Sequence, residues 1–351
     1  MSSVFQLIEE VASRSASDLH LTAHVPPLAR IHGHIVPLND TPLSPEDCRD
    51  LVYSGLNAAQ QARFEENWEL DFLLELPAGG RCRGNAHISR GCVEAAYRIV
   101  PDSIPDLMQL GHRPTITRLL DLPSGLVLIT GTTGSGKSTT LASMIQMIAA
   151  RRSGVIITIE DPVEFLFQNQ LSIIKQREVG SDTHSFAQAL KHVLRQDPDV
   201  IVVSEMRDQE TIQAGITAAE TGHLVLATLH TMDAPKTIDR LVDIFPHQQQ
   251  NQVTTQLANC LQAVLSQRLI PRADGEGRVV ATELLLNNLA VASCIRDRKA
   301  HQLHGCMEMG RNEGMHTIDG HLVELLEQEM ITPEVALANA LDESSISDYL
   351  P

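Results

Sequence analysis

The sequence predicts an α/β protein in which a small α+β domain precedes a larger domain built on a mostly parallel sheet. Three observations predict this class. Short, uninterrupted aliphatic runs recur between residues 126 and 229, and such runs are typical of parallel strands covered on both faces. A glycine-rich loop joins the first run to a helical pattern. Earlier in the chain, polar and apolar residues alternate instead, which indicates half-buried strands.

Composition is typical of a water-soluble globular protein. The chain has 351 residues, enough for two domains, of which 43% are hydrophobic and 20% charged. Its formal net charge of -17 argues against a general nucleic-acid binder, because neutralising phosphates takes clustered Lys and Arg. We therefore expect no direct nucleic-acid partner.

The six cysteines do not form a recognisable motif. None lies in a C-x-x-C arrangement, so a zinc ribbon or a thioredoxin-type pair is not expected, and free thiols suit a reducing compartment. The sequence shows no signal peptide and no apolar run long enough to cross a bilayer. We expect a cytoplasmic protein that meets a membrane only through a partner.

Residues 1–100 are expected to form the small α+β domain. Gly33 marks a turn within one alternating segment. Ser44 followed by Pro45 is the signature of a helix N-cap and the first helical residue. The expected strands cover residues 17–22, 29–35, 68–76 and 83–99.

A linker and a second domain are expected to follow. Pro101, Pro105 and Pro114 interrupt residues 101–120, which we interpret as an interdomain linker. Residues 121–351 then form the second domain. Its expected strands cover residues 126–129, 155–159, 200–203 and 224–229, and its expected helices include one capped by Ser185 and a last one that starts at Thr332-Pro333. The C-terminal third is expected to be mostly helical.

The glycine-rich loop after the first of these strands fits G-x-x-x-x-G-K-[ST], a pattern that binds nucleotide phosphates. Its glycines let backbone amides approach a phosphate, Lys137 supplies positive charge, and the Ser138 hydroxyl can ligate Mg²⁺. The flanking strand and helix put the phosphates at a helix N-terminus. The expected phosphate-binding residues are Gly131, Thr132, Thr133, Gly134, Ser135, Gly136, Lys137, Ser138 and Thr139.

Acidic residues follow two of the other expected strands. Glu205 stands where a Walker B carboxylate would face the metal, although a solvated loop glutamate is the alternative. Glu160, Asp161 and Glu164 follow another strand. Three acids beside phosphates repel them unless metal or water intervenes, so one acid could accept a proton from water. The alternative is a helix N-terminus that carries acids for its dipole.

Histidines and arginines are candidates for the remaining roles. His223 and His230 bracket one strand and could sense a γ-phosphate, although a histidine at a strand end is more often simply hydrogen-bonded. Arg81, Arg83 and Arg98 of the first domain could supply positive charge, and surface arginines on a strand are the alternative. The histidines at positions 20, 24, 32 and 34 lie on separate elements, which does not favour a metal site.

Several segments together resemble the secretion ATPases of the type II secretion and type IV pilus class, and within them the retraction branch. The resemblance covers nearly the whole chain. Its segments are Ala16–Leu21, Arg81–Asn85, Thr130–Thr140, Ile157–Phe165, Gln176–Gly180, Asp197–Asp208, Ala218–His230 and Lys236–Pro246.

The resemblance implies a PAS-like N-terminal domain, a RecA-like P-loop ATPase domain with a helical C-terminal part, and a homo-hexamer that binds ATP and Mg²⁺. It also implies pilus retraction at the inner membrane, with a platform protein and a paralogous retraction ATPase as partners. The implied catalytic residues are Glu164, with Glu160 nearby, Glu205, His230, Arg83 and Arg98, and the implied metal ligands are Ser138 and Glu205.

Departures from the family pattern leave alternatives open. The chain lacks the C-x-x-C metal insert of assembly-type relatives, which favours retraction. However, Thr132, Ser204 and Gly84 replace the usual proline, glycine and apolar residue, and Ala290–Asp297 only weakly matches a retraction-linked stretch. An accessory paralogue, a nucleotide-gated ring subunit, and a motor for DNA uptake or protein secretion remain alternatives.

Overall fold

The chain forms two compact units. The computed structural model describes residues 3–14, 16–31, 33–77, 80–100 and 103–349, so His32 and Pro101 lie outside the described residues. One unit comprises Met1–Ser103 and Pro162–Leu166, and the other comprises Ile104–Asp161 and Phe167–Pro351. Within the described ranges, no helix is both long and apolar enough to cross a membrane.

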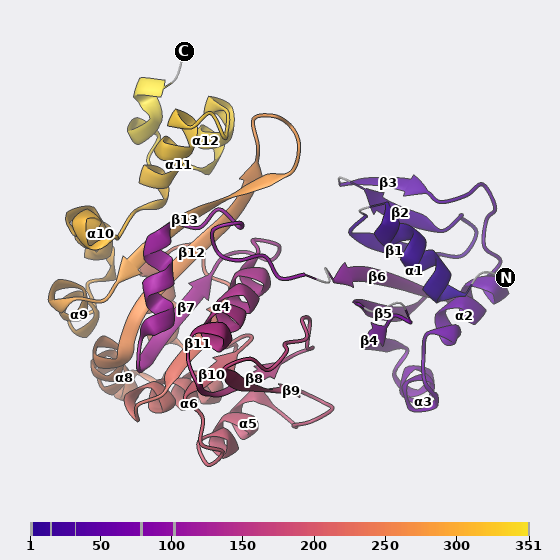
Figure 1. The fold of residues 1–351 in the computed structure, drawn as a ribbon, viewed down its shortest axis with the longest axis horizontal. Helices are drawn as coiled ribbons and strands as arrows, with labels where there is room; N and C mark the ends of the chain where they lie inside the picture. The colour runs from indigo at the N-terminus through magenta and orange to yellow at the C-terminus, as the bar shows by residue number, and fades with distance from the viewer. Residues whose placement is uncertain (1–2, 15, 32, 78–79, 101–102, 350–351) are drawn as a thin grey trace. The chain divides into compact units, whose positions relative to one another are not determined.

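The first unit is an antiparallel sheet with helices packed on it (Figure 1). Its strands lie in the order β3-β2-β1-β6-β5-β4. The strands are β1 (Asp18–Leu21), β2 (Leu28–Ile31), β3 (His34–Pro37), β4 (Glu69–Glu75), β5 (Arg81–Ser89) and β6 (Cys92–Val100). The helices are α1 (Val4–Ser13), α2 (Pro45–Ser54) and α3 (Ala58–Asn67).

Local sequence explains these elements. The Ser44 side chain accepts a hydrogen bond from the amide of the third helical residue, and Pro45 is the first, so α2 begins where the sequence predicts. Phe72 and Tyr97 meet edge to face in the core, with their ring centroids 5.9 Å apart. A Cβ on Gly84 would lie 2.3 Å from the Phe72 ring. Glycine at this position therefore makes room for that ring.

The second unit is built on a mostly parallel sheet with strands in the order β13-β12-β7-β11-β10-β8-β9. Only the β12–β13 pair is antiparallel among these described strands. The strands are β7 (Gly125–Thr130), β8 (Gly154–Glu160), β9 (Ser172–Glu178), β10 (Val200–Val203), β11 (Leu224–Leu229), β12 (Leu261–Pro271) and β13 (Arg278–Leu286).

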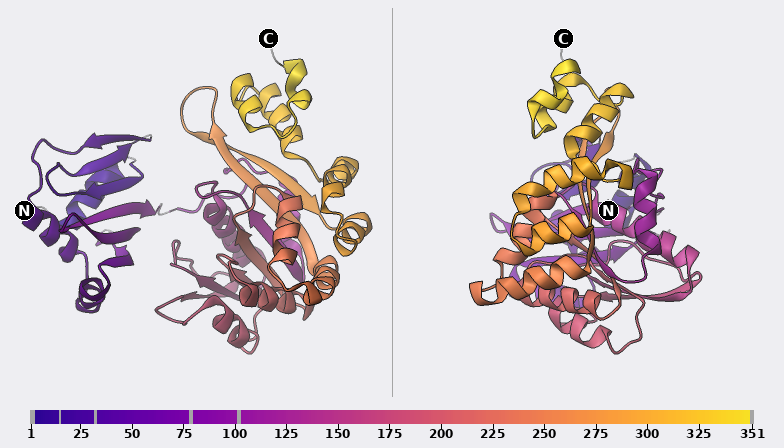
Figure 2. Two further views of the ribbon diagram at one scale, coloured as in Figure 1. Left: turned by 180° about the vertical axis from the view of Figure 1, so that it is seen from behind. Right: turned by 90° about the vertical axis from the view of Figure 1, so that its left-hand side faces the viewer.

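Helices cover both faces of this sheet (Figures 1 and 2). Leu126 and Leu128 of β7 pack on one helical layer, while Val127 and Ile129 pack on the other, because successive side chains of a strand alternate between faces. The first layer contains α5 (Phe186–Val193), α6 (Gln209–Glu220), α7 (Ala234–Asp243), α8 (His247–Cys260), α9 (Leu289–Arg296) and α10 (Leu303–Met309). The second contains α4 (Lys137–Arg151) and the 3-10 helix η1 (Pro114–Asp121).

The predicted fold class is confirmed, including the helical C-terminal part. That part includes α11 (Ile318–Glu327), α12 (Pro333–Asn339) and the 3-10 helix η4 (Glu343–Tyr349), which pack on the far end of the β12–β13 hairpin. The hairpin itself and β9 were not predicted from periodicity. Within the stretch interpreted as a linker, residues from Ile104 onward belong to the second unit, and Leu107 and Ile116 are buried in its core.

Candidate functional site

Loops that carry the predicted polar side chains meet at one edge of the parallel sheet. Strand β7 ends at Thr130 opposite Leu229 of β11, and Val203 at the end of β10 lies opposite Ile159 of β8. The residues that follow these strands therefore start at the same carboxyl edge, where ligands bind in open α/β sheets. They are the loop 131–136, His230, Ser204 with Glu205, and the strand-end residue Glu160.

The loop has the backbone conformation that its glycines predict. Gly131, Gly134 and Gly136 have φ angles of 148°, 79° and 89°, in the region that favours glycine. A Cβ on Gly131 would lie 2.3 Å from the backbone oxygen of Gln267, so the loop passes very close to β12. At Gly134 a Cβ would meet nothing within 4 Å among the described atoms. The loop is thus held against β12 on one side and open on the other.

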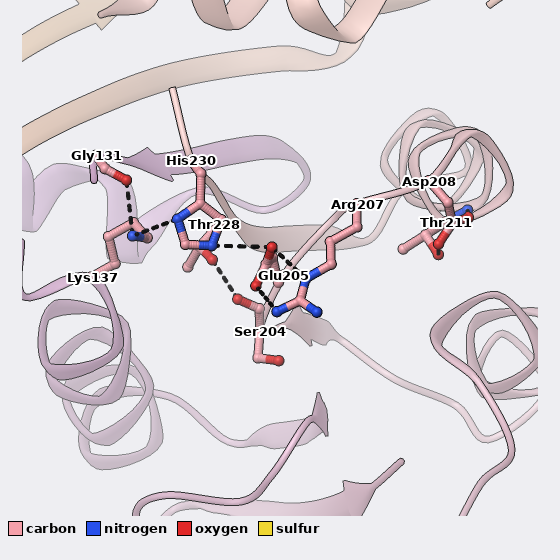
Figure 3. Close-up of polar contacts among 9 residues, drawn as sticks. All are labelled: Gly131, Lys137, Ser204, Glu205, Arg207, Asp208, Thr211, Thr228 and His230. Carbon is pink, nitrogen blue, oxygen red and sulfur yellow. Dashed lines mark hydrogen bonds and ion pairs between the residues drawn. The ribbon is translucent and has the colours of Figure 1, made fainter. Parts of the chain in front are cut away.

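Lys137 lies under this loop. Its side chain is 8% exposed, and Nζ donates hydrogen bonds to the backbone oxygens of Gly131 and Thr132, each at 2.9 Å. Nζ also lies 3.4 Å from Nδ1 of His230 (Figure 3). Burial lowers the pKa of Lys137, and the nearby Glu205 carboxylate opposes that shift.

The N-terminus of α4 is available to an anion. Gly136 is its N-cap, and no side chain of the described residues caps it, so the first amides of the helix have no side-chain acceptor. Ser138 is exposed in the first turn. Amides without a side-chain cap at a helix N-terminus, next to a lysine and a glycine with open space beside it, fit a nucleotide phosphate.

Glu205 lies at the centre of a polar cluster (Figure 3). His230 Nε2 lies 3.1 Å from Glu205 Oε1, and Arg207 forms two bonds, from Nε to Oε1 at 2.5 Å and from Nη2 to Oε2 at 2.7 Å. Burial raises the pKa of Glu205, but the hydrogen bonds from Arg207 and His230 outweigh it, so the pKa lies below its ordinary value. Glu205 is therefore a charged oxygen donor, the kind of ligand that Mg²⁺ takes together with phosphate oxygens.

The backbone around Glu205 is fixed on both sides. Thr228 of β11 donates a hydrogen bond from its hydroxyl to the backbone oxygen of Ser204, and its own backbone oxygen accepts one from the Met206 amide at 3.1 Å. After Arg207, Asp208 caps α6 by accepting a bond from the Thr211 amide at 2.9 Å. The position of Glu205 thus follows from the end of β10 and the start of α6.

Glu160 ends strand β8 at the same edge. Its side chain accepts hydrogen bonds from the Thr158 hydroxyl at 2.6 Å and from Nε2 of Gln176 at 3.0 Å. These bonds hold the carboxylate in place. They come from β8 itself and from β9, the strand that periodicity did not predict.

The remaining predicted residues lie in the first unit or have structural partners. Glu164 belongs to the segment that clusters with the first unit, and there its Oε1 lies 3.9 Å from Nη1 of Arg83. Arg98 pairs with Asp18 at 2.9 Å.

Three other candidates have partners of their own. Arg81 pairs with Glu75 at 2.6 Å, and Nδ1 of His223 bonds the backbone oxygen of Ala218 at 3.0 Å. Across the described ranges, no group of three or more His, Cys, Asp or Glu side chains could hold a metal ion.

Sequence reasoning missed two residues that brace the phosphate loop. Nε2 of Gln267 donates to the backbone oxygen of Ser135 at 2.7 Å, and the Ser266 hydroxyl accepts a bond from Thr130 at 2.9 Å. Both belong to β12. Their only sequence signal is that Ser266 and Gln267 interrupt the apolar run Ala263–Leu265. Arg207 was also missed, although it stands two residues after Glu205.

A phosphate-binding loop between the first strand and first helix of a mostly parallel sheet, with an acid after a nearby strand, defines a P-loop nucleotide-binding protein. The particular family follows from comparison. The family model for the type II/IV secretion system protein matches residues 96–343, and the chain belongs to this family of secretion ATPases. The resemblance read from the motifs is therefore confirmed.

Individual relatives are similar over nearly their whole length. The type IV pilus retraction ATPase PilT of Pseudomonas aeruginosa is 42% identical over 337 residues, covering 96% of this chain and 98% of the relative. The type IV pilus ATPase PilU of the same organism is 41% identical, covering 95% and 88%. A crystal structure of the pilus retraction motor PilT with bound ADP has a TM-score of 0.91 and 46% identity, and covers 99% of this chain and 100% of that one.

Proposed function

We propose that the chain is a Mg²⁺-dependent ATPase that powers retraction of type IV pili as a homo-hexamer. One observation carries the proposal: the open phosphate loop over Lys137 lies in a chain that matches, nearly end to end, a retraction motor crystallised with ADP. The names of the similar relatives support retraction as the work performed.

The second unit binds the nucleotide. Lys137, the loop 131–136 and the first amides of α4 hold the phosphates. Ser138 and Glu205 supply oxygens to the metal, with Glu205 acting directly or through water. When bound, Mg²⁺ neutralises charge on the phosphate oxygens. His230 links Lys137 to Glu205, and its place between them suits a residue that reads the γ-phosphate.

The remaining residues accept the proton and supply positive charge. Glu164 orients the attacking water and takes its proton, and Glu160 is the alternative base, since it ends the strand beside β10. Arg83 and Arg98 of the PAS-like N-terminal domain, residues 1–100, supply positive charge. Hydrolysis moves this domain against the RecA-like domain, residues 121–351, and the part of the 101–120 stretch from Ile104 onward moves with the RecA-like domain, in whose core it is packed.

A ring of such subunits would pass its motion to a platform protein of the inner membrane. We infer a cytoplasmic protein held at that membrane by this partner, with a paralogous retraction ATPase as a further partner. PilU of Pseudomonas aeruginosa is the kind of relative that such a paralogue would resemble.

Lys137→Ala tests the nucleotide site. Loss of the only lysine under the loop among the described residues should abolish binding of a fluorescent ATP analogue and ATP turnover. Lys191→Ala is the matched control, because that lysine is exposed on α5 and its ion pair with Glu210 is long, at 3.9 Å. Full activity in Lys137→Ala, with the control also active, would refute the phosphate-loop role.

An accessory paralogue is the second candidate. The chain is almost as similar to PilU, at 41% identity, as to PilT, at 42%. A deletion strain separates the candidates: excess surface pili without twitching support a retraction motor, whereas normal twitching supports an accessory role. Bald cells would instead indicate assembly. Turnover measured on the purified ring identifies a nucleotide-gated subunit, which would bind ATP and hydrolyse almost none.

A further inference from the structure

Arg207 binds the carboxylate of Glu205, which the proposed function assigns to the metal. Its guanidinium meets both oxygens of Glu205, at 2.5 Å for Nε–Oε1 and 2.7 Å for Nη2–Oε2 (Figure 3). The first of these oxygens also meets Nε2 of His230 at 3.1 Å. Neither oxygen of Glu205 is therefore left without a cationic or N–H partner.

The Arg207–Glu205 ion pair has favourable geometry, and Arg207 is exposed enough to separate from Glu205. A planar guanidinium matches a carboxylate with two parallel bonds, and such pairs are stronger than single contacts. The Glu205 side chain is only 15% exposed, whereas that of Arg207 is 66% exposed. Because the arginine lies on the solvent side, it can leave without disturbing the packed end of β10.

A second acid also attracts Arg207. Asp161, which follows β8, attracts Arg207 electrostatically in the present arrangement. Arg207 therefore keeps a weak electrostatic attraction to Asp161 when its bonds to Glu205 are lost, which offsets part of the cost of moving it.

We propose that Arg207 competes with the metal ion for Glu205, so that metal binding to the nucleotide complex exchanges the guanidinium for the cation. Arg207 is then a positioning residue that acts through Glu205. It holds the carboxylate of Glu205 in place at the strand end while the nucleotide site is empty, and it sets the metal concentration at which the site fills. This inference rests on the assignment of Glu205 as a metal ligand.

The experiment measures binding rather than turnover. A fluorescent, non-hydrolysable ATP analogue is titrated onto the full chain in EDTA and at increasing Mg²⁺, and Mn²⁺ binding to the same complex is followed by electron paramagnetic resonance. Arg207→Gln should lower the Mg²⁺ concentration for half-saturation by about three- to tenfold, which corresponds to the strength of a partly exposed ion pair. Affinity for the analogue in EDTA should stay unchanged. The half-saturating Mg²⁺ concentration of Arg207→Lys should lie between those of the wild type and Arg207→Gln, since an ammonium group cannot form two parallel bonds with a carboxylate.

Two controls isolate the competition. Arg272→Gln removes a similar pair from the β12–β13 loop, in which Nε and Nη2 of Arg272 bond the carboxylate of Asp274, two residues away. This control variant should leave the Mg²⁺ dependence unchanged. In a Glu205→Gln background, Arg207→Gln should have no further effect, because the shared carboxylate is gone.

The sign of the change decides the matter. A competing arginine predicts tighter metal binding when it is removed, whereas an arginine that only supports Glu205 predicts weaker binding. An unchanged or higher half-saturating Mg²⁺ concentration in Arg207→Gln, with melting temperature and EDTA affinity like the wild type, overturns the competition alone. A wild-type chain that binds no analogue under either condition overturns the proposed function itself, and this inference with it.

Discussion

Replacing Gln267 with methionine should weaken nucleotide binding by loosening the phosphate loop. Gln267 of β12 is 1% exposed, and its Nε2 donates to the backbone oxygen of Ser135, a residue 3% exposed, at 2.7 Å. Methionine has a similar volume and no hydrogen-bond donor, so the substitution removes the bond without opening a large cavity. Ser135 lies in the middle of the loop that holds Lys137.

The structure sets the size of the effect. A buried carbonyl left without a donor costs about 1–3 kcal/mol. The other end of the Gln267 amide, Oε1, has no hydrogen-bond partner among the described residues, so losing that oxygen adds no further cost. If the loop relaxes to reach another donor, nucleotide binding must restore its conformation. Since 1.4 kcal/mol is a factor of ten, affinity should fall by about five- to 150-fold.

The assay pairs equilibrium unfolding with titration of a fluorescent ATP analogue, and Gln250→Met is its matched control. Gln250 of α8 is 3% exposed, and its Nε2 donates to the backbone oxygen of Phe245 at 2.9 Å, so the same kind of bond is lost, together with a contact of 3.3 Å between Oε1 and Nδ1 of His247. Both variants should lose similar stability, but only Gln267→Met should lose affinity. Equal destabilisation with wild-type affinity in both would refute the idea that β12 braces the loop.

Three further outcomes are expected. Glu164→Gln should keep ATP affinity while slowing hydrolysis by about a hundredfold or more, the scale of the rate lost without a general base. Unchanged turnover would assign the role of base to Glu160, and the same assay on Glu160→Gln would test that assignment. Gly84→Ala should lower the free energy of unfolding by about 1–3 kcal/mol, because its Cβ would lie 2.3 Å from an aromatic ring; a wild-type denaturation midpoint would contradict this. Burial, followed by the nearby Arg113 charge, lowers the pKa of His316 from 6.5 to about 3, so between these pH values the unfolded chain binds a proton that the folded chain does not bind. The free energy of unfolding should therefore fall as the pH drops from 6.5 to about 3, and it should fall less steeply in His316→Gln. Denaturation curves measured across this range with the same slope in both proteins would count against the assignment.

The sequence alone predicted the part of the site that is local in the chain. β7, the glycine loop and α4 are consecutive, and each has its own signal: an aliphatic run, the spaced glycines with Lys137, and a helical period. The placement of Glu205 and His230 at one sheet edge also followed, because carboxyl ends of parallel strands meet there. These predictions needed only the period of each element and the rule that joins parallel strands.

The tertiary structure decided which side chains meet. The bond between Gln267 and Ser135 spans 132 positions, and no period within β12 reveals it. Nor could the sequence show that Arg207, rather than solvent, lies on both oxygens of Glu205, or that Glu164 clusters with the first unit beside Arg83. A pattern of residues fixes the conformation of a segment, because that depends on near neighbours. Contacts between distant segments depend on how whole elements pack, and only the folded chain determines them.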